Sequence, residues 1–329
     1  MAWRIYKHTD TGAPLASNLN TYGQFSAILR ACLIDGYGSG VDLKTPQGNW
    51  EEPFPEANNV SVFRSLTGNR QFYQFSDNKA YSVEVNAYES MTAVDNGIGN
   101  WVLGSKSTYF GKHYNSGYGW IVLANDTTVI WISIDGYASW APHMFGEFES
   151  IWSAYPYNNM VAGNSTYTYR GAQYGPFSSL SAISRTSITG PRIAIHRLPD
   201  GTGLGAMLGC NSITANLAGP SSVSYMSNPL PNKKPILSPI FIGGVADTVS
   251  APSGSSFYYK YFNLGIIPLI LAMDSPLFEW DVSFDETREW TDIDTGTSYL
   301  LLPFGLTSWD NASYDQPRSQ YAIPLEGVS

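Results

Sequence analysis

The sequence predicts a mostly β protein, with antiparallel sheets in a sandwich- or barrel-like arrangement and one amphipathic helix at about residues 21–35. Many short segments are rich in β-branched and aromatic residues and are bounded by Gly, Asn, Asp, Ser or Pro, which is the pattern of strands and turns. The chain holds 31 glycines and 20 prolines, and 14% of its residues are aromatic. Both features favour many turns and many strands.

One segment has helical periodicity. Its apolar residues recur at i, i+3, i+4, i+7 and i+8 and form one stripe of a helix: Phe25, Ile28, Leu29, Cys32 and Leu33. Asn20 or Thr21 can act as the N-cap, because their side-chain oxygens accept hydrogen bonds from the first free backbone amides. Gly36 stands where a left-handed residue would end the helix.

Short strands account for the following elements. We expect them, from their β-branched and aromatic content, at Val60–Arg64, Gln71–Phe75, Tyr81–Val85, Tyr118–Leu123, Val129–Ile134, Thr166–Arg170, Arg192–Arg197, Ile236–Ile242, Phe257–Phe262, Phe278–Phe284 and Ser298–Phe304. The clearest hairpin runs from Ile121 to Trp131, with Asn125 and Asp126 near its tip.

The length of 329 residues corresponds to one or two domains. We expect an N-terminal helix and β domain at 1–160 and a β-rich region at 161–329, with a single domain as the alternative. Residues 201–232 carry no charge and are rich in Gly, Ser, Asn and Pro. Long loops of this kind are usually functional or engage a partner, so we predict an arm here that lies against neighbouring subunits.

The charge balance argues against a nucleic-acid partner, and the lengths of the apolar runs argue against membrane insertion. Lys and Arg number 18 against 27 Asp and Glu, a net charge of −9, and the longest basic cluster is Lys233-Lys234. Nucleic-acid binding needs clustered basic residues, so we expect no nucleic-acid partner. The longest apolar run, residues 265–273, is far shorter than the roughly 20 residues of a membrane span. The first residues lack the apolar core of a signal peptide, and we expect no membrane insertion.

Metal and cofactor chemistry finds little support. Cys32 and Cys210 are far apart and are expected to be buried free thiols, with a single disulfide as the alternative. The histidines form no metal-binding spacing; they are His8, His113, His143 and His196. Asp292–Gly296 lacks the later acidic ligands of a calcium loop. No Walker loop or dinucleotide motif is present, so we expect no cofactor and no metal.

Catalytic motifs are equally sparse. Ser39 lies in a glycine-rich run, but Tyr37 occupies the position at which a nucleophile elbow requires glycine. Paired carboxylates beside aromatic residues could cleave sugars. The nearest examples are Glu51-Glu52 after Trp50, and Glu279 with Asp281, which share one face of a predicted strand. Ordinary amphipathic pairing explains both pairs, so we expect no enzyme.

Six segments together resemble a group of structural proteins of tailed-bacteriophage virions. They keep the same order along most of the chain: Thr9–Pro14, Leu29–Gly38, Gly48–Trp50 with the following Glu-Glu-Pro-Phe, Tyr88–Met91, Phe145–Ser150 and Gly265–Leu269. Around residues 40–47, the loop before Trp50 is longer than in that group. The resemblance implies a virion component assembled in the host cytoplasm, and it carries no catalytic residues over to this chain.

These observations give three functional hypotheses. The first is a non-enzymatic structural component at the tail tip or baseplate, the collar or the head exterior, whose partners are other virion proteins and copies of itself. The second is a module that binds a host receptor or glycan through exposed aromatic residues near Trp101, Tyr109, Tyr114 and Trp120. The third is a glycan hydrolase that uses Glu279 and Asp281.

Overall fold

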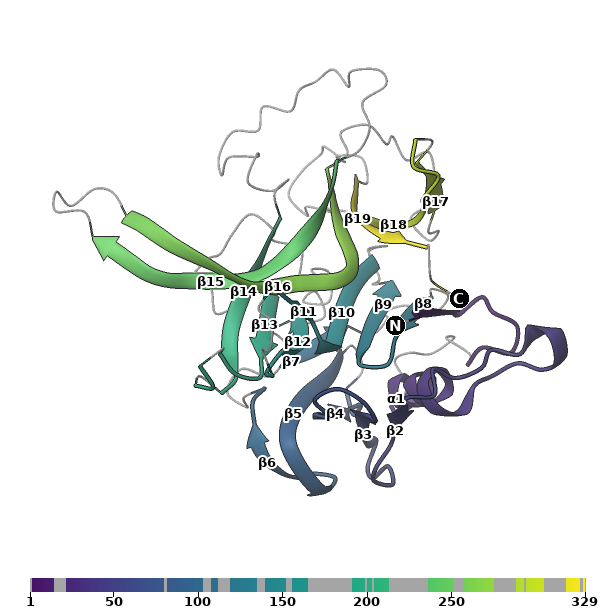
Figure 1. Ribbon diagram of the computed structural model, residues 1–329. Coiled ribbons are helices and arrows are strands. Elements are labelled where there is room, and N and C mark those ends of the chain that lie inside the picture. Colours follow the sequence, from purple (N-terminus) through teal and green to yellow (C-terminus); the bar gives the residue numbers. More distant parts are fainter. Residues whose placement is uncertain are drawn as a thin grey trace, which may run out of the picture.

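Three antiparallel sheets and one helix near the N-terminus make up the fold, so the predicted mostly β class is confirmed (Figure 1). The structure is a computed structural model. It describes residues 2–14, 22–79, 82–102, 108–111, 119–134, 140–151, 156–164, 191–198, 200–202, 204–212, 236–250, 257–274, 288–292, 294–304, 318–325 and 328. Within these ranges, no helix is long and apolar enough to cross a membrane.

The first sheet comes from the N-terminal third of the chain. β5 pairs with β4 along one edge, and with β6 and β7 along the other. The strands of this sheet are β2 (Trp50–Glu51), β3 (Val60–Ser65), β4 (Phe72–Ser76), β5 (Ser82–Ala93), β6 (Asn96–Asn100) and β7 (Thr108–Gly111).

The middle sheet collects strands from distant parts of the sequence. It contains β1 (Arg4–Lys7), β8 (Trp120–Ala124), β9 (Thr128–Ile134), β10 (Trp140–Glu147), β12 (Asn159–Asn164), β13 (Pro191–Ile195) and β14 (Ala206–Ser212), paired in that order. The first sheet joins it where Tyr109 of β7 pairs with Asn164 of β12.

The third sheet is formed by the C-terminal half. Its strands are β11 (Glu149–Ser150), β15 (Ile236–Ser250), β16 (Phe257–Asp274), β17 (Arg288–Thr291), β18 (Ser298–Phe304) and β19 (Arg318–Pro324). β14 connects this sheet to the middle one, because its first half pairs with β13 and its second half pairs with β15.

The middle sheet is buried on both faces. In β8, Val122 belongs to the core shared with the first sheet, while Ile121 and Leu123 belong to the core shared with the third sheet. Successive residues of a strand point to opposite faces, so a strand covered on both sides must be apolar throughout. The unbroken apolar sequence of β8 follows from this position in the fold.

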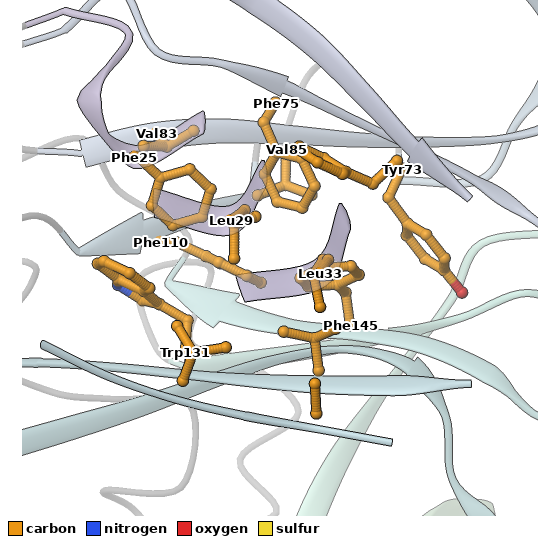
Figure 2. Close-up of a cluster of buried hydrophobic side chains, with 14 of the residues drawn as sticks. Phe25, Leu29, Leu33, Tyr73, Phe75, Val83, Val85, Phe110, Trp131 and Phe145 are labelled. Atoms are coloured by element: carbon orange, nitrogen blue, oxygen red, sulfur yellow. The ribbon is translucent and has the colours of Figure 1, made fainter. Parts of the chain in front are cut away.

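Helix α1 (Gln24–Arg30), which continues as a π turn at Ala31–Asp35, fills the space between the first two sheets. The predicted stripe is confirmed, and all five of its residues have no exposed surface. Figure 2 shows Phe25, Leu29 and Leu33 between the side chains of the two sheets. The Phe25 ring centroid lies 5.3 Å from that of Phe75 in β4 and 4.7 Å from that of Trp131 in β9.

The predicted residue ends the helix at its C-terminus, whereas the cap at its N-terminus comes from another element. Gly36 has φ 76° and its N–H donates to the carbonyl of Ala31, as predicted for the C-terminal stop. The predicted caps Asn20 and Thr21 lie outside the described residues. The residue at the N-cap position is Gly23, and the cap itself comes from elsewhere: the carboxylate of Asp77, at the end of β4, accepts a hydrogen bond from the N–H of Phe25 at 2.8 Å.

All nine predicted strands that fall on described residues are present. β3, β4, β5, β8, β9, β13, β15, β16 and β18 correspond to predicted segments, and the predicted hairpin is β8–β9 with its tip at Asn125 and Asp126. Thr166–Arg170 and Phe278–Phe284 lie outside the described residues. The prediction stopped β15 at Ile242 and β16 at Phe262, far short of their ends at Ser250 and Asp274.

The predicted arm at 201–232 needs a correction. Residues 206–212 form β14, whose first three residues pair with β13 and whose last four pair with β15. Leu204 packs against the core between the first two sheets. An uncharged, glycine-rich segment can form a strand where paired strands satisfy its backbone groups. Residues 213–232 lie outside the described part of the chain. The domain boundary predicted near residue 160 falls inside β12.

Candidate functional site

The sequence-derived catalytic candidates do not converge. Ser39 is an exposed loop residue before a 3-10 turn at Gly40–Asp42. The carboxylates of the Glu51-Glu52 pair are bound to different cations: Arg64 donates to Glu51, and Arg30 donates to both oxygens of Glu52, at 2.6 and 2.8 Å. Each carboxylate is therefore held in an ion pair of its own. Glu279 and Asp281 lie outside the described residues.

The metal candidates are also dispersed. His8 bonds the backbone of Trp120, His143 is buried in β10, and His196 follows β13. His113 lies outside the described residues. The Asp292–Gly296 turn links β17 to β18, and the N–H of Asp294 donates to the Asp292 carboxylate at 3.0 Å. In the described part of the chain, no group of three or more His, Cys, Asp or Glu residues could hold a metal ion.

Two of the four aromatic residues proposed for glycan stacking are buried. Trp101 and Trp120 have no exposed surface. Tyr109 lies in β7, and Tyr114 lies outside the described residues. The expectation that Trp101 and Trp120 present stacking surfaces is therefore wrong. A β protein with two packed cores needs these large side chains as filling.

One polar cluster joins the first and middle sheets. A single carboxylate oxygen of Glu89, Oε1, accepts from Nε2 of His196 at 2.7 Å and from Nε and Nη2 of Arg197 at 2.9 and 2.6 Å. The His196 ring lies 5.7 Å from the ring of Trp101 and 5.5 Å from that of Tyr157. Local sequence patterns give no signal for this cluster, because Glu89 and His196 are 107 residues apart.

The protonation states in this cluster are mutually consistent. Burial would raise the pKa of Glu89, but the hydrogen bonds from His196 and Arg197 outweigh it and lower that pKa. Burial lowers the pKa of His196. A charged Glu89 and a neutral imidazole require the proton on Nε2, which leaves Nδ1 as an acceptor that is buried and has no hydrogen-bond partner among the described residues. His196 is only 5% exposed, so the cluster serves as an internal brace.

The feature that extends beyond the three layers is the β15–β16 hairpin (Figure 1). Its base is anchored: β14 pairs with residues 240–243, β11 pairs with Gly265 and Ile266, and β19 pairs with Leu271 and Ala272. The buried residues of this base are Ile240, Ile242, Leu264, Ile267 and Ile270. A Cβ on Gly265 would lie 2.3 Å from the carbonyl oxygen of Glu149, so only glycine allows this close approach.

Beyond the base, the hairpin has only two strands. We name residues 244–250 and 257–263 the distal ribbon. Its residue pairs run from Gly244↔Phe262 to Ser250↔Phe257, and among the described residues no third strand pairs with either edge. At about 3.3 Å per residue, the ribbon is roughly 20 Å long. Unpaired strand edges are templates for pairing with another chain.

The sequence contains a signal for this hairpin that the strand prediction did not use. Two long β-rich runs flank residues 251–256, which are Ala-Pro-Ser-Gly-Ser-Ser. Turn residues between two such runs are typical of a hairpin. The length of each run beyond the core indicates the extension.

The segments that carry the phage-virion resemblance contact one another. The hydroxyl of Tyr37 donates to the carboxylate of Asp10 at 2.6 Å. The rings of Trp50 and Phe145 lie 5.5 Å apart, and Glu149 pairs with Ile266. Five of the six segments thus take part in contacts within the cores and sheet edges. Comparison of the chain with protein-family models and with curated proteins gives no match.

Proposed function

We propose that this chain is a non-enzymatic structural component of a tailed-phage virion. It is assembled in the host cytoplasm and packs against other virion proteins and copies of itself, at the tail tip or baseplate, the collar or the head exterior. The resemblance of six sequence segments supports the virion class. The observation that carries the assembly function is the distal ribbon, which extends from an anchored base.

A two-stranded ribbon is suited to assembly because it is incomplete by itself. An isolated hairpin is at best marginally stable in water, and a third strand or a packing surface stabilises it. Among the described residues, no third strand pairs with the distal ribbon. Virion positions are symmetric and hold several copies of a subunit, so a neighbouring subunit can supply the missing strand.

The two other hypotheses have less support. A glycan-binding module needs exposed aromatic rings, and Trp101 and Trp120 are fully buried. A hydrolase would depend on Glu279 and Asp281, for which no geometry is described.

Mass spectrometry of purified particles of the encoding phage tests the proposal, with the copy number measured relative to the major capsid protein. We expect a stoichiometric presence. About six or twelve copies would indicate the tail tip or collar, and hundreds would indicate head decoration. Absence from washed particles would overturn the proposal.

A further inference from the structure

We propose that the distal ribbon assembles copies of this chain head to tail, with the β16 edge of one copy paired to the β15 edge of the next. The inference deepens the proposed function and rests on it, because it names the partner of the distal ribbon as a second copy of this chain. It is argued from the backbone pairing of the ribbon and from the charges along its two edges.

Neither edge of the ribbon pairs with a third strand in the part of the chain that the structure describes. Natural edge strands are usually protected by charged residues, by proline or by β-bulges. The ribbon has one register shift, between Val245 and Asp247, and the pairing of β15 with β16 continues beyond it to Ser250. Residues 244–250 contain one charged residue, Asp247, and no proline, and residues 257–263 contain one charged residue, Lys260, and no proline. The ribbon is also rich in residues that favour strands; the aromatic ones are Phe257, Tyr258, Tyr259, Tyr261 and Phe262.

The two edges have complementary charges at the same level. Asp247 pairs with Lys260 within the hairpin, so the acidic residue of the β15 edge and the basic residue of the β16 edge lie at one height along the ribbon. A second ribbon placed alongside in the same orientation brings its Asp247 opposite Lys260 of the first. Pairing either edge with the same edge of another copy, centred on its charge, would instead place like charges opposite, which is destabilising.

The overall charge also favours contact here. The whole chain has a net charge of −9, whereas the distal ribbon has one acidic and one basic residue and is neutral. A contact through the ribbons therefore brings no net like charge together. Head-to-tail pairing uses a different edge on each copy, so it can continue around a ring. Rings match the cyclic symmetry of a tail tip, baseplate or collar.

The test exchanges these charges in the full-length chain and measures association by sedimentation equilibrium. Asp247→Lys and Lys260→Asp each place like charges at every seam between copies. We expect each variant alone to associate at least tenfold more weakly than wild type, which should form species of several times 36.1 kDa. Asp42→Lys is the matched control, because it makes the same charge change on an exposed residue outside the ribbon.

An equimolar mixture of the two variants separates contacts between copies from contacts within one. Each variant has like charges within its own ribbon, and mixing cannot repair that. Between copies, however, Lys260 of the Asp247→Lys chain meets Asp247 of the Lys260→Asp chain, and the substituted residues also meet as opposite charges. We expect the mixture, and the double exchange D247K/K260D, to regain wild-type association within about threefold.

Three results would overturn the inference: a wild-type chain that stays at 36.1 kDa, single variants that associate as wild type does, or a mixture no stronger than its components. Circular dichroism of each variant identifies any loss of folding; for a variant that fails this check, the mixture with its partner decides. Particle mass spectrometry tests the virion function independently of the ribbon contact. If the chain is present in particles but wild type and the charge variants are all monomeric, the ribbon contact alone is contradicted. If the chain is absent from particles, the virion function is contradicted.

Discussion

The carboxylate of Asp77 accepts a hydrogen bond from the N–H of Phe25 at 2.8 Å, so a side chain 52 residues away caps the helix. The backbone carbonyl of Asp77 also accepts from the N–H of Gly23 at 3.1 Å. Asp77 has no exposed surface. The end of β4 thereby fixes where α1 begins, and with it the position of Phe25 between the two sheets.

Asp77→Ala is expected to lower the free energy of unfolding by about 2 kcal/mol, the upper part of the range for a lost N-cap, because the freed amide is buried. Asp77→Asn keeps an acceptor oxygen and should lose clearly less. Urea unfolding of the two variants and the wild type measures both values. Equal losses for Ala and Asn would show that the cap is not what Asp77 contributes.

Acid should destabilise the chain through the Glu89 and His196 pair. Both folded pKa values are lowered, so the native state favours the deprotonated form of each group. Their contribution is present above the unfolded pKa values, about 6.5 for His and 4.3 for Glu, and is lost as pH falls through the folded values. The free energy of unfolding should therefore decrease from pH 7 to pH 4.

His196→Gln tests the histidine part of this pH dependence. Glutamine can donate to Glu89 but does not titrate, so the decrease between pH 7 and pH 5 should become smaller than in wild type. His8→Gln is the matched comparison, because burial also lowers the pKa of His8. Its removal should take away only the part of the pH dependence that His8 contributes. An unchanged pH profile in His196→Gln would contradict the assignment.

Gly38→Ala should be considerably more damaging than Gly40→Ala. Both glycines have positive φ, 81° and 59°, so both substitutions strain the backbone by about 1 kcal/mol. A Cβ on Gly38 would also lie 2.4 Å from the carbonyl oxygen of Asp42, whereas nothing lies within 4 Å of a Cβ on Gly40. Thermal unfolding of the two variants compares them, and similar melting temperatures would argue against the close contact.

Cys32 should react with thiol reagents only when the chain unfolds. It has no exposed surface, and burial raises the pKa of its thiol, while the reactive species is the thiolate. In a Cys210→Ser variant Cys32 is the only thiol, so maleimide labelling at pH 8 reports it alone. We expect labelling to be slow in buffer and rapid in denaturant. Rapid labelling of the folded chain would contradict the burial of Cys32.

The contacts that depend on local periodicity could be predicted from the sequence. The stripe from Phe25 to Leu33 defined the helix, and the Asn125-Asp126 tip between two apolar runs defined the β8–β9 hairpin. In both cases the residues that decide the structure are close neighbours, so spacing alone carries the information. The mostly β class followed from many such short segments.

Long-range contacts decided the rest. Residues 206–212 look like a loop by composition but form β14, because β13 pairs with its first half and β15 with its second half. Asp77 caps a helix from another element, and Glu89 meets His196 from 107 residues away. The sequence by itself determined which segments are helix or strand and where the charges of the distal ribbon stand. Only the tertiary structure decided which segments meet and which strand edges lack a partner among the described residues, because these depend on how the three sheets stack around their shared cores.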